Sequence, residues 1–342
     1  MNMKIVLIFG TLLLSVGKFL LPQSVRIVRI PDEVKAVENE VVEVYAHNMS
    51  GEEIYRAHRM YISNNYIYLA SDKPVEMIKL SLNGEVVGRV GRKGQGPGEF
   101  LFIFGIYGFG KNIYILDTRI QKLVIYNDGL EFVKEYKLRE RYSYCLIDNK
   151  KSFVLYGRPS ADYYFSVYSE RLKFLRYFGR SMTSASDNMK KFSFDLVRYA
   201  VYVQEEDGIW ACFKNRYDLR YYKQEKLIAE IKAKTGFFSG KEQDNFGRKY
   251  MEYKDKSLHL AKDNNRLYYL YNKDNRTYCD IFDLSDYKLM QRLKFAFKYI
   301  RIVYHKENTF YALRYDKNED RDVLFVRLKT QLKIKEENHG KS

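Results

Sequence analysis

Cationic residues recur in one turn of a repeated strand pattern, where they could bind an anionic ligand. The pattern is an aromatic or β-branched run, a polar turn and a second such run, and it returns six times along the 342 residues. If these turns share one rim, they form a ring of positive charge suited to a glycan or peptide carboxylate. The candidate ligand-binding residues are Lys73, Arg119, Arg158, Arg216, Arg276 and Arg321, accompanied by Lys273 and Lys317.

The same turns also carry acidic residues, which leaves a second interpretation open. Asp favours turns because its side chain bonds to nearby backbone, and an exposed Lys or Arg costs little free energy. Local neutralisation and ordinary turn chemistry therefore explain the pattern equally well. The acidic residues are Asp72, Asp117, Asp162, Asp218, Asp274 and Asp316.

The histidines show no spacing typical of metal binding or catalysis. His58, His259 and His305 could approach one another from innermost strands of different repeats, but no HExxH or paired spacing is present. No GxSxG elbow occurs either. We expect no metal and no cofactor, we assign no catalytic residue, and a non-catalytic function is favoured over an enzymatic one.

The three cysteines lie far apart, in three different repeats. An odd, sparse set is neither a disulfide framework nor a metal-ligand pattern. We expect Cys145, Cys212 and Cys279 to be small buried side chains on strands, because free cysteine is among the most buried residue types. One disulfide between neighbouring units remains open as the alternative outside the cytoplasm.

Residues 91–98 are rich in glycine and raise the question of a phosphate-binding loop. Such a loop ends in Gly-Lys-Ser/Thr and leads into a helix, whereas here Glu99 and a strand pattern follow. We favour a structural crossover between two units, in which the glycines adopt positive φ and the proline fixes one φ. The crossover residues are Gly91, Gly94, Gly96, Pro97 and Gly98.

The elements that must position these residues are antiparallel hairpins. Turn formers such as Asn83-Gly84 separate the runs, and the copies recur every roughly 40–58 residues. A unit that cannot bury its apolar face alone must stack on its neighbours. The pattern predicts an all-β fold, a six-bladed β-propeller around a channel. The copies begin near Asn65, Lys111, Lys151, Asp207, Asn265 and Asn308.

The ends of this pattern predict how the ring closes. A strand at about residues 41–45 precedes the first copy, and the sixth copy runs out after residues 323–328. We expect the N-terminal strand to complete the last blade and so remove an exposed edge. Two inserts, near residues 180–191 and 233–254, are either specificity loops or covers for one end of the ring.

Residues 87–100 (VGRVGRKGQGPGEF), followed by IYILDTRIQKLVIYN at residues 113–127, resemble the glycine-rich signature of NHL-type repeats. The chain is especially similar to bacterial exported six-bladed β-propeller proteins, and the looser strand pattern covers nearly all of residues 40–330. The Pro that usually follows the Phe is missing, and Gly-Pro-Gly is absent from the other five repeats. The resemblance implies the fold and an extracytoplasmic location. It also implies an alternative function, because NHL-like lyases use a metal held by His.

The N-terminus carries a secretory signal pattern. Lys4 precedes an apolar run over residues 5–16, and Ser15 and Gly17 stand in the −3/−1 relation to a cleavage site. An uncleaved anchor is the alternative, because Phe19 and the next two leucines extend the apolar stretch. The predicted organisation is a signal peptide or anchor at 1–17, a propeller at 25–330 and a polar C-terminal tail at 331–342.

The net charge of +16 favours anionic partners. Export argues against nucleic acid, and a membrane is expected to be contacted only through an uncleaved anchor. We therefore predict a periplasmic, secreted or cell-surface β-propeller that is not catalytic. It binds a macromolecule or an acidic glycan or peptide at its channel face. The alternative is an extracytoplasmic metal-dependent lyase or hydrolase.

Overall fold

The computed structural model describes seventeen segments of the chain, and every regular element within them is a β-strand. The segments are residues 25–30, 37–38, 44–47, 57–138, 142–147, 153–157, 163–180, 200–204, 208–213, 217–224, 226–234, 237–238, 240–245, 248–253, 256–299, 301–315 and 323–329. The predicted signal segment and C-terminal tail lie outside them. Within the described segments no helix is long and apolar enough to cross a membrane.

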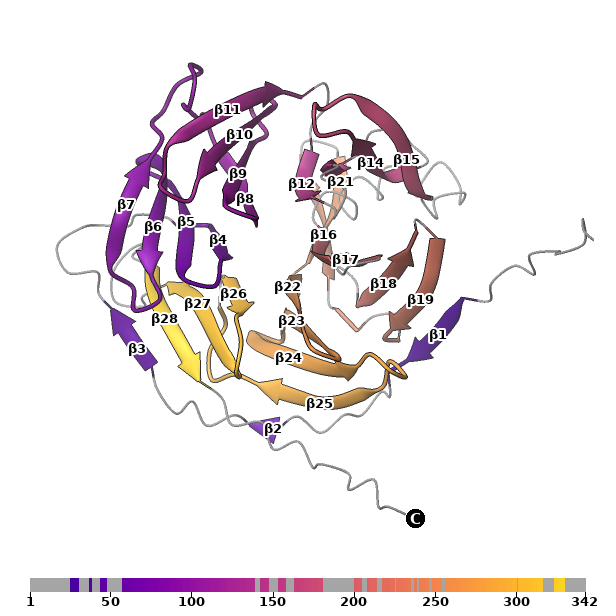
Figure 1. The fold of residues 1–342 in the computed structure, drawn as a ribbon. Coiled ribbons are helices and arrows are strands. Elements are labelled where there is room, and N and C mark those ends of the chain that lie inside the picture. The colour runs from indigo at the N-terminus through magenta and orange to yellow at the C-terminus, as the bar shows by residue number, and fades with distance from the viewer. Residues whose placement is uncertain are drawn as a thin grey trace, which may run out of the picture.

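Six antiparallel sheets stand around a common centre, which confirms the predicted six-bladed β-propeller (Figure 1). Each blade is built on four antiparallel strands, listed here from the centre outwards. The first blade holds β4 (Arg59–Ile62), β5 (Tyr66–Asp72), β6 (Val75–Ser81) and β7 (Val86–Val90). The second holds β8 (Ile103–Phe109), β9 (Asn112–Asp117), β10 (Lys122–Asn127) and β11 (Phe132–Lys137). The third holds β12 (Tyr142–Ile147), β13 (Phe153–Gly157), β14 (Tyr163–Tyr168) and β15 (Phe174–Arg180).

The remaining three blades repeat this order. The fourth holds β16 (Ala200–Gln204), β17 (Gly208–Phe213), β18 (Asp218–Lys223) and β19 (Lys226–Lys232). The fifth holds β22 (Lys256–Asp263), β23 (Arg266–Lys273), β24 (Arg276–Asp283) and β25 (Leu289–Lys294). The sixth holds β26 (Arg301–Tyr304), β27 (Thr309–Tyr315), β28 (Val323–Lys329) and β3 (Val44–His47). The innermost strands β4, β8, β12, β16, β22 and β26 contact one another in that order, and β26 closes the ring on β4.

The second and third strands of the blades are buried on both faces, which explains their unbroken apolar runs. In β5, Ile67 and Leu69 pack toward the sixth blade, while Tyr68 and Ala70 pack toward the second. Successive side chains of a strand point to opposite faces, so each strand serves two blade interfaces. Six separate apolar clusters fill the six interfaces between blades.

The cysteines contribute to these interfaces as the sequence predicts. Cys145, Cys212 and Cys279 are buried free thiols in three different clusters, and none forms a disulfide. Burial raises the pKa of the Cys145 and Cys279 thiols, which keeps them protonated.

Three N-terminal strands, which together we call the belt, lie along the outside of the last three blades (Figure 1). The strand β3 pairs antiparallel with β28, so the predicted closure of the sixth blade is confirmed. Two further pairings were not predicted: β1 (Arg26–Arg29) lies parallel to β19, and β2 (Val37–Glu38) lies parallel to β25. The belt therefore ties three consecutive blades together from outside.

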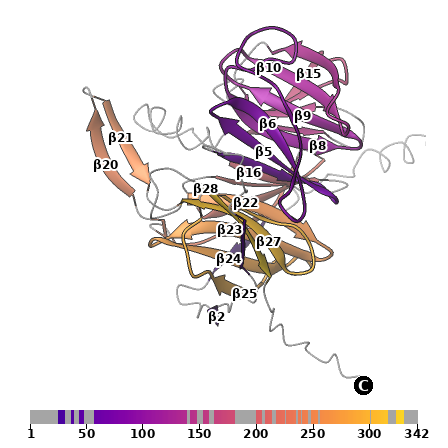
Figure 2. The ribbon, with the colours of Figure 1, turned by 90° about the vertical axis from the view of Figure 1, so that its left-hand side faces the viewer.

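The insert predicted at residues 233–254 contains a hairpin of β20 (Gly240–Asn245) and β21 (Arg248–Tyr253). Figure 2 shows this hairpin standing out from the ring. The chain before it is anchored by Phe237 and Phe238, whose rings pack on Tyr217 and Tyr271. The other predicted insert, near residues 180–191, lies almost entirely outside the described residues.

Candidate functional site

One face of the ring gathers the starts of the innermost strands. In a blade of four antiparallel strands, the first strand begins at the same end as the turn between the second and third. Arg59, Lys256 and Arg301 are each the first residue of an innermost strand, in the first, fifth and sixth blades. Since β26 contacts both β22 and β4, these three starting points are neighbours. We call this side the entry face and the three residues the central cations.

Two of the central cations bond to the same backbone oxygen. The Nη1 of Arg59 donates to the carbonyl of His58 over 2.9 Å, and the Nε of Arg301 donates to that carbonyl over 3.0 Å. Arg59 also donates to the carbonyl of Phe104 and lies 4.7 Å from the centre of the Phe104 ring. A backbone carbonyl thus orients both guanidinium groups, and Arg59 also rests against an aromatic face.

Lys256 experiences this positive charge directly. Burial, followed by the charges of Arg301, Lys298 and Arg59, lowers the pKa of Lys256 to about 8. Burial and the charge of Arg59 likewise lower the pKa of Arg301, and only Tyr107 acts in the opposite direction. Within the described segments neither Lys256 nor Arg301 forms an ion pair. The central cations are half-buried, so solvent still reaches them, and their like charges make this part of the entry face electropositive.

The three histidines considered from the sequence make separate contacts. His58 has its Nε2 2.7 Å from the carbonyl of Ile103 and its Nδ1 3.3 Å from a carboxylate oxygen of Asp72. Burial and the charge of Arg301 lower the pKa of His259 to about 3, so His259 is neutral at physiological pH. The ring of His305 lies 5.9 Å from that of Tyr311. Among the described residues no group of three His, Cys, Asp or Glu side chains could hold a metal ion.

The turn cations predicted from the sequence lie partly within the described segments. Lys73 and Arg119 are exposed in the β5–β6 and β9–β10 turns, and Arg276 begins β24 and donates to the carbonyl of Ala296. All three turns join a second to a third strand, so they lie on the entry face around the central cations. The remaining predicted positions, Arg158, Arg216 and Arg321, fall outside the described residues.

Aromatic rings link one turn to the centre. The guanidinium of Arg119 lies 5.3 Å from the centre of the Phe102 ring, and that ring stacks at 4.9 Å on His58. The centre of the Phe102 ring also lies 6.2 Å from that of Phe104, and the guanidinium of Arg59 lies over the Phe104 ring. The entry face therefore offers aromatic surface beside positive charge in this sector.

The glycine-rich segment connects β7 of the first blade to β8 of the second, on the entry face. Gly91 and Gly98 have positive φ, whereas the expectation of positive φ at Gly94 and Gly96 is wrong. Those two glycines instead make room for Glu99, because a Cβ on Gly94 would lie 2.0 Å and one on Gly96 3.0 Å from its carboxylate.

The Glu99 carboxylate lies inside the turn of the glycine-rich segment. It accepts hydrogen bonds from the Gly96 amide over 2.8 Å and from Arg92 over 2.7 Å. These two donors lower the pKa of Glu99, so it remains ionised. The donors of this segment are thus satisfied by its own carboxylate, which agrees with a structural role.

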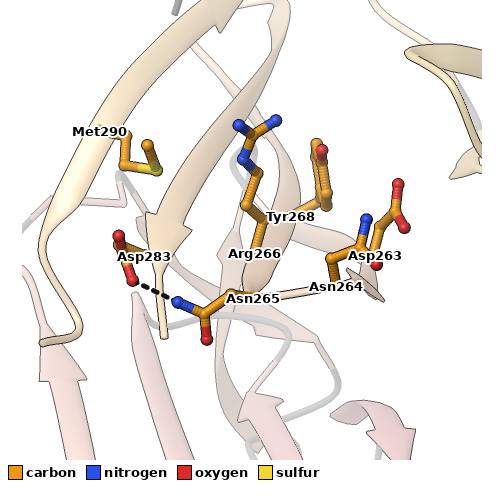
Figure 3. A pocket seen from close by; sticks show the side chains of 7 residues that line it. All are labelled: Asp263, Asn264, Asn265, Arg266, Tyr268, Asp283 and Met290. Carbon is orange, nitrogen blue, oxygen red and sulfur yellow. Dashed lines mark hydrogen bonds between the residues drawn. The ribbon is translucent and has the colours of Figure 1, made fainter. Parts of the chain in front are cut away.

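A cavity of about 320 Å³ lies at the opposite face, at the turn between β22 and β23 (Figure 3). Its acidic groups serve local structure: Asp263 accepts a bond from Tyr304 over 2.6 Å, and Asp283 accepts one from Asn265 over 2.8 Å. These bonds fix the hairpin ends. The cavity is therefore weaker as a candidate site than the central cations.

The central cations were not predicted from the sequence because the sequence repeats do not begin where the blades begin. The copies begin at the second strand of each blade, so each innermost strand lies at the end of the preceding copy. Aligning the residues that open the first strand would have revealed a cation in three adjacent blades. The turns recur more clearly in the sequence, so only their cations were predicted.

The fold has clear relatives among solved structures, although sequence identity is low. A candidate exported protein of Bacteroides fragilis is 11% identical with a TM-score of 0.59, and the match covers 90% of this chain and all (100%) of that one. A DUF4221 family member from Bacteroides vulgatus is 12% identical with a TM-score of 0.60, covering 86% and 98%. A catalytically inactive virginiamycin B lyase from Staphylococcus aureus, with quinupristin, is 9% identical with a TM-score of 0.52, covering 85% and 89%.

These likenesses show that the chain has the propeller fold. No family model matches the chain, and no curated protein matches it. The resemblance to NHL-type repeats therefore stays a prediction.

Proposed function

We propose that the chain is an exported β-propeller that binds an acidic glycan or peptide on its entry face without transforming it. The observation that carries this proposal is the pair Lys256 and Arg301, which form no ion pair within the described segments and lie close enough to each other and to Arg59 to lower their pKa values. A protein gains no stability from half-buried like charges, so their arrangement is explained by an anion that completes it. The turn cations extend the positive surface outwards.

Export is supported by the signal pattern at residues 1–17 and by the fold shared with a candidate exported protein. The alternative function, an extracytoplasmic metal-dependent lyase or hydrolase, stays a prediction. One neighbour in fold is a lyase, and fold alone does not carry an activity from one protein to another.

Titration of the purified chain with polygalacturonate and poly-L-glutamate tests the proposal. We expect binding of at least one of these polyanions, with an affinity that falls steadily as sodium chloride rises. Neutral dextran and polylysine are the matched controls. Absence of binding to both polyanions at low salt would overturn the proposal, and chain shortening of polygalacturonate would favour the lyase instead.

A further inference from the structure

We infer that the central cations select a phosphate monoester, the doubly charged group of a phosphorylated ligand. This inference rests on the proposed function and specifies which anion reaches the centre of the entry face. It concerns Arg59, Lys256 and Arg301, which open three adjacent innermost strands.

The charge of the site favours a dianion over a monoanion. Lys256 faces Arg301, Lys298 and Arg59, and Arg301 faces Arg59 and Tyr107. The nearby His259 is neutral at physiological pH. A carboxylate or sulfate monoester brings one negative charge to the two half-buried cations Lys256 and Arg301, whereas a phosphate monoester brings nearly two. The dianion therefore relieves more of the mutual repulsion.

The donors of the site also suit a tetrahedral oxyanion. Arg301 donates its Nε to the His58 carbonyl, and within the described segments its two terminal nitrogens make no further hydrogen bond, so they form a planar fork. Lys256 adds a compact ammonium from the neighbouring strand. A fork from one side and a point charge from another match the oxygens of a phosphoryl group, while a planar carboxylate presents only two oxygens.

A pair of isosteric probes tests this selection. Methyl phosphate and methyl sulfate have nearly the same shape but differ by one charge above the second pKa of the phosphate, about 6. We expect methyl phosphate to bind about tenfold more tightly at pH 7.4, measured by calorimetry. Inorganic phosphate and glucose 1-phosphate form two further arms, which separate free phosphate from a phosphorylated sugar as the source.

Variants localise the binding. Arg301→Gln and Lys256→Gln should each weaken methyl phosphate binding by about tenfold, and either variant alone suffices if the other does not fold. Lys262→Gln is the matched control, because Lys262 is exposed at the far end of the same strand β22. It should leave the affinity unchanged.

The dependence on pH gives a second readout. Methyl phosphate affinity should rise between pH 5 and pH 7 as the ligand loses its second proton, and methyl sulfate affinity should not. Both should fall above the Lys256 pKa of about 8.

Equal affinity for methyl phosphate and methyl sulfate would overturn the inference, as would full binding by both variants. Polyanion binding retained alongside either result would leave the proposed function standing. If the wild-type protein binds methyl phosphate but neither polyanion, only the proposed function is overturned.

Discussion

On the entry face, two residues occupy positions that disfavour their charged form. Lys256 and Arg301 are cations whose pKa values are lowered by burial and by neighbouring positive charge. In the interior, by contrast, a buried cation has a carboxylate partner. Arg292 forms two 2.7 Å hydrogen bonds with the fully buried Asp280. A buried cation paired with a carboxylate stabilises the fold, whereas the binding proposed above rests on half-buried cations that lack such a partner within the described segments.

We predict that Lys256→Gln stabilises the unliganded protein. The pKa of Lys256 is lowered from 10.5 to about 8, so the folded state disfavours the charged form. At pH 7 the variant should gain about 1 kcal/mol in free energy of unfolding, after allowance for solvent screening.

The gain should shrink as pH rises from about 8 to 10.5, because the unfolded wild-type chain then binds more protons than the folded one. Urea unfolding of both proteins at pH 7, 9 and 10.5 measures the difference, in which the titration of other groups cancels. A variant less stable than the wild type at pH 7 would contradict this account.

At the scale of elements, the crossover between the first two blades depends on a few backbone positions. Gly91 has a φ of 91°, and a Cβ there would lie 2.7 Å from the ring of Phe100, which is fully buried. Gly96 lacks positive φ, and its added Cβ would meet only the end of the Glu99 side chain. The two glycines are therefore required for different reasons and to different degrees.

We predict that Gly91→Ala lowers the free energy of unfolding by about 3 kcal/mol, since both backbone strain and overpacking act at that position. Gly96→Ala should cost less than about 1 kcal/mol, because the Glu99 carboxylate can shift. Thermal and urea unfolding of the two variants give the comparison. Similar losses in both would show that crowding around Glu99 matters as much as φ at Gly91.

Sequence patterns predicted the elements well where both strand faces are buried. The runs of β5 and β9 are continuous and apolar, and Asn83-Gly84 marks a turn in which Gly84 has positive φ. The outer strands β1 and β2 escaped notice because each is short and adds only an edge pairing. Contacts between blades, including the shared carbonyl of His58, depend on ring closure and have no local signature.

For the whole molecule, the belt distributes the N-terminal segment over three blades. It supplies the fourth strand of the sixth blade and a fifth strand to the fourth and fifth blades. These contributions differ in weight, because losing β3 exposes the edge of β28, whereas losing β1 uncovers the edge of a blade that is already complete.

We predict a graded response to shortening the belt. Removal of residues 1–36 should leave a folded protein with a lower melting temperature, because β1 and the buried Ile30 are lost. Removal of residues 1–47 should abolish cooperative unfolding, because the sixth blade loses β3. Circular dichroism melts of both deletions, with the protein beginning at residue 18 as control, measure the difference. A cooperative melt of the longer deletion would refute the role of β3 in closure.

The pairing of β3 with β28 joins strands from opposite ends of the chain. Segments made early in synthesis must wait for the last strand before the ring can close. Such long-range pairing gives a high contact order and slow folding. Until it forms, the edges of the unfinished blades can pair with other chains. Chaperones should therefore be needed most before β3 pairs with β28. An unlinked β3 peptide supplied in excess should shorten that period.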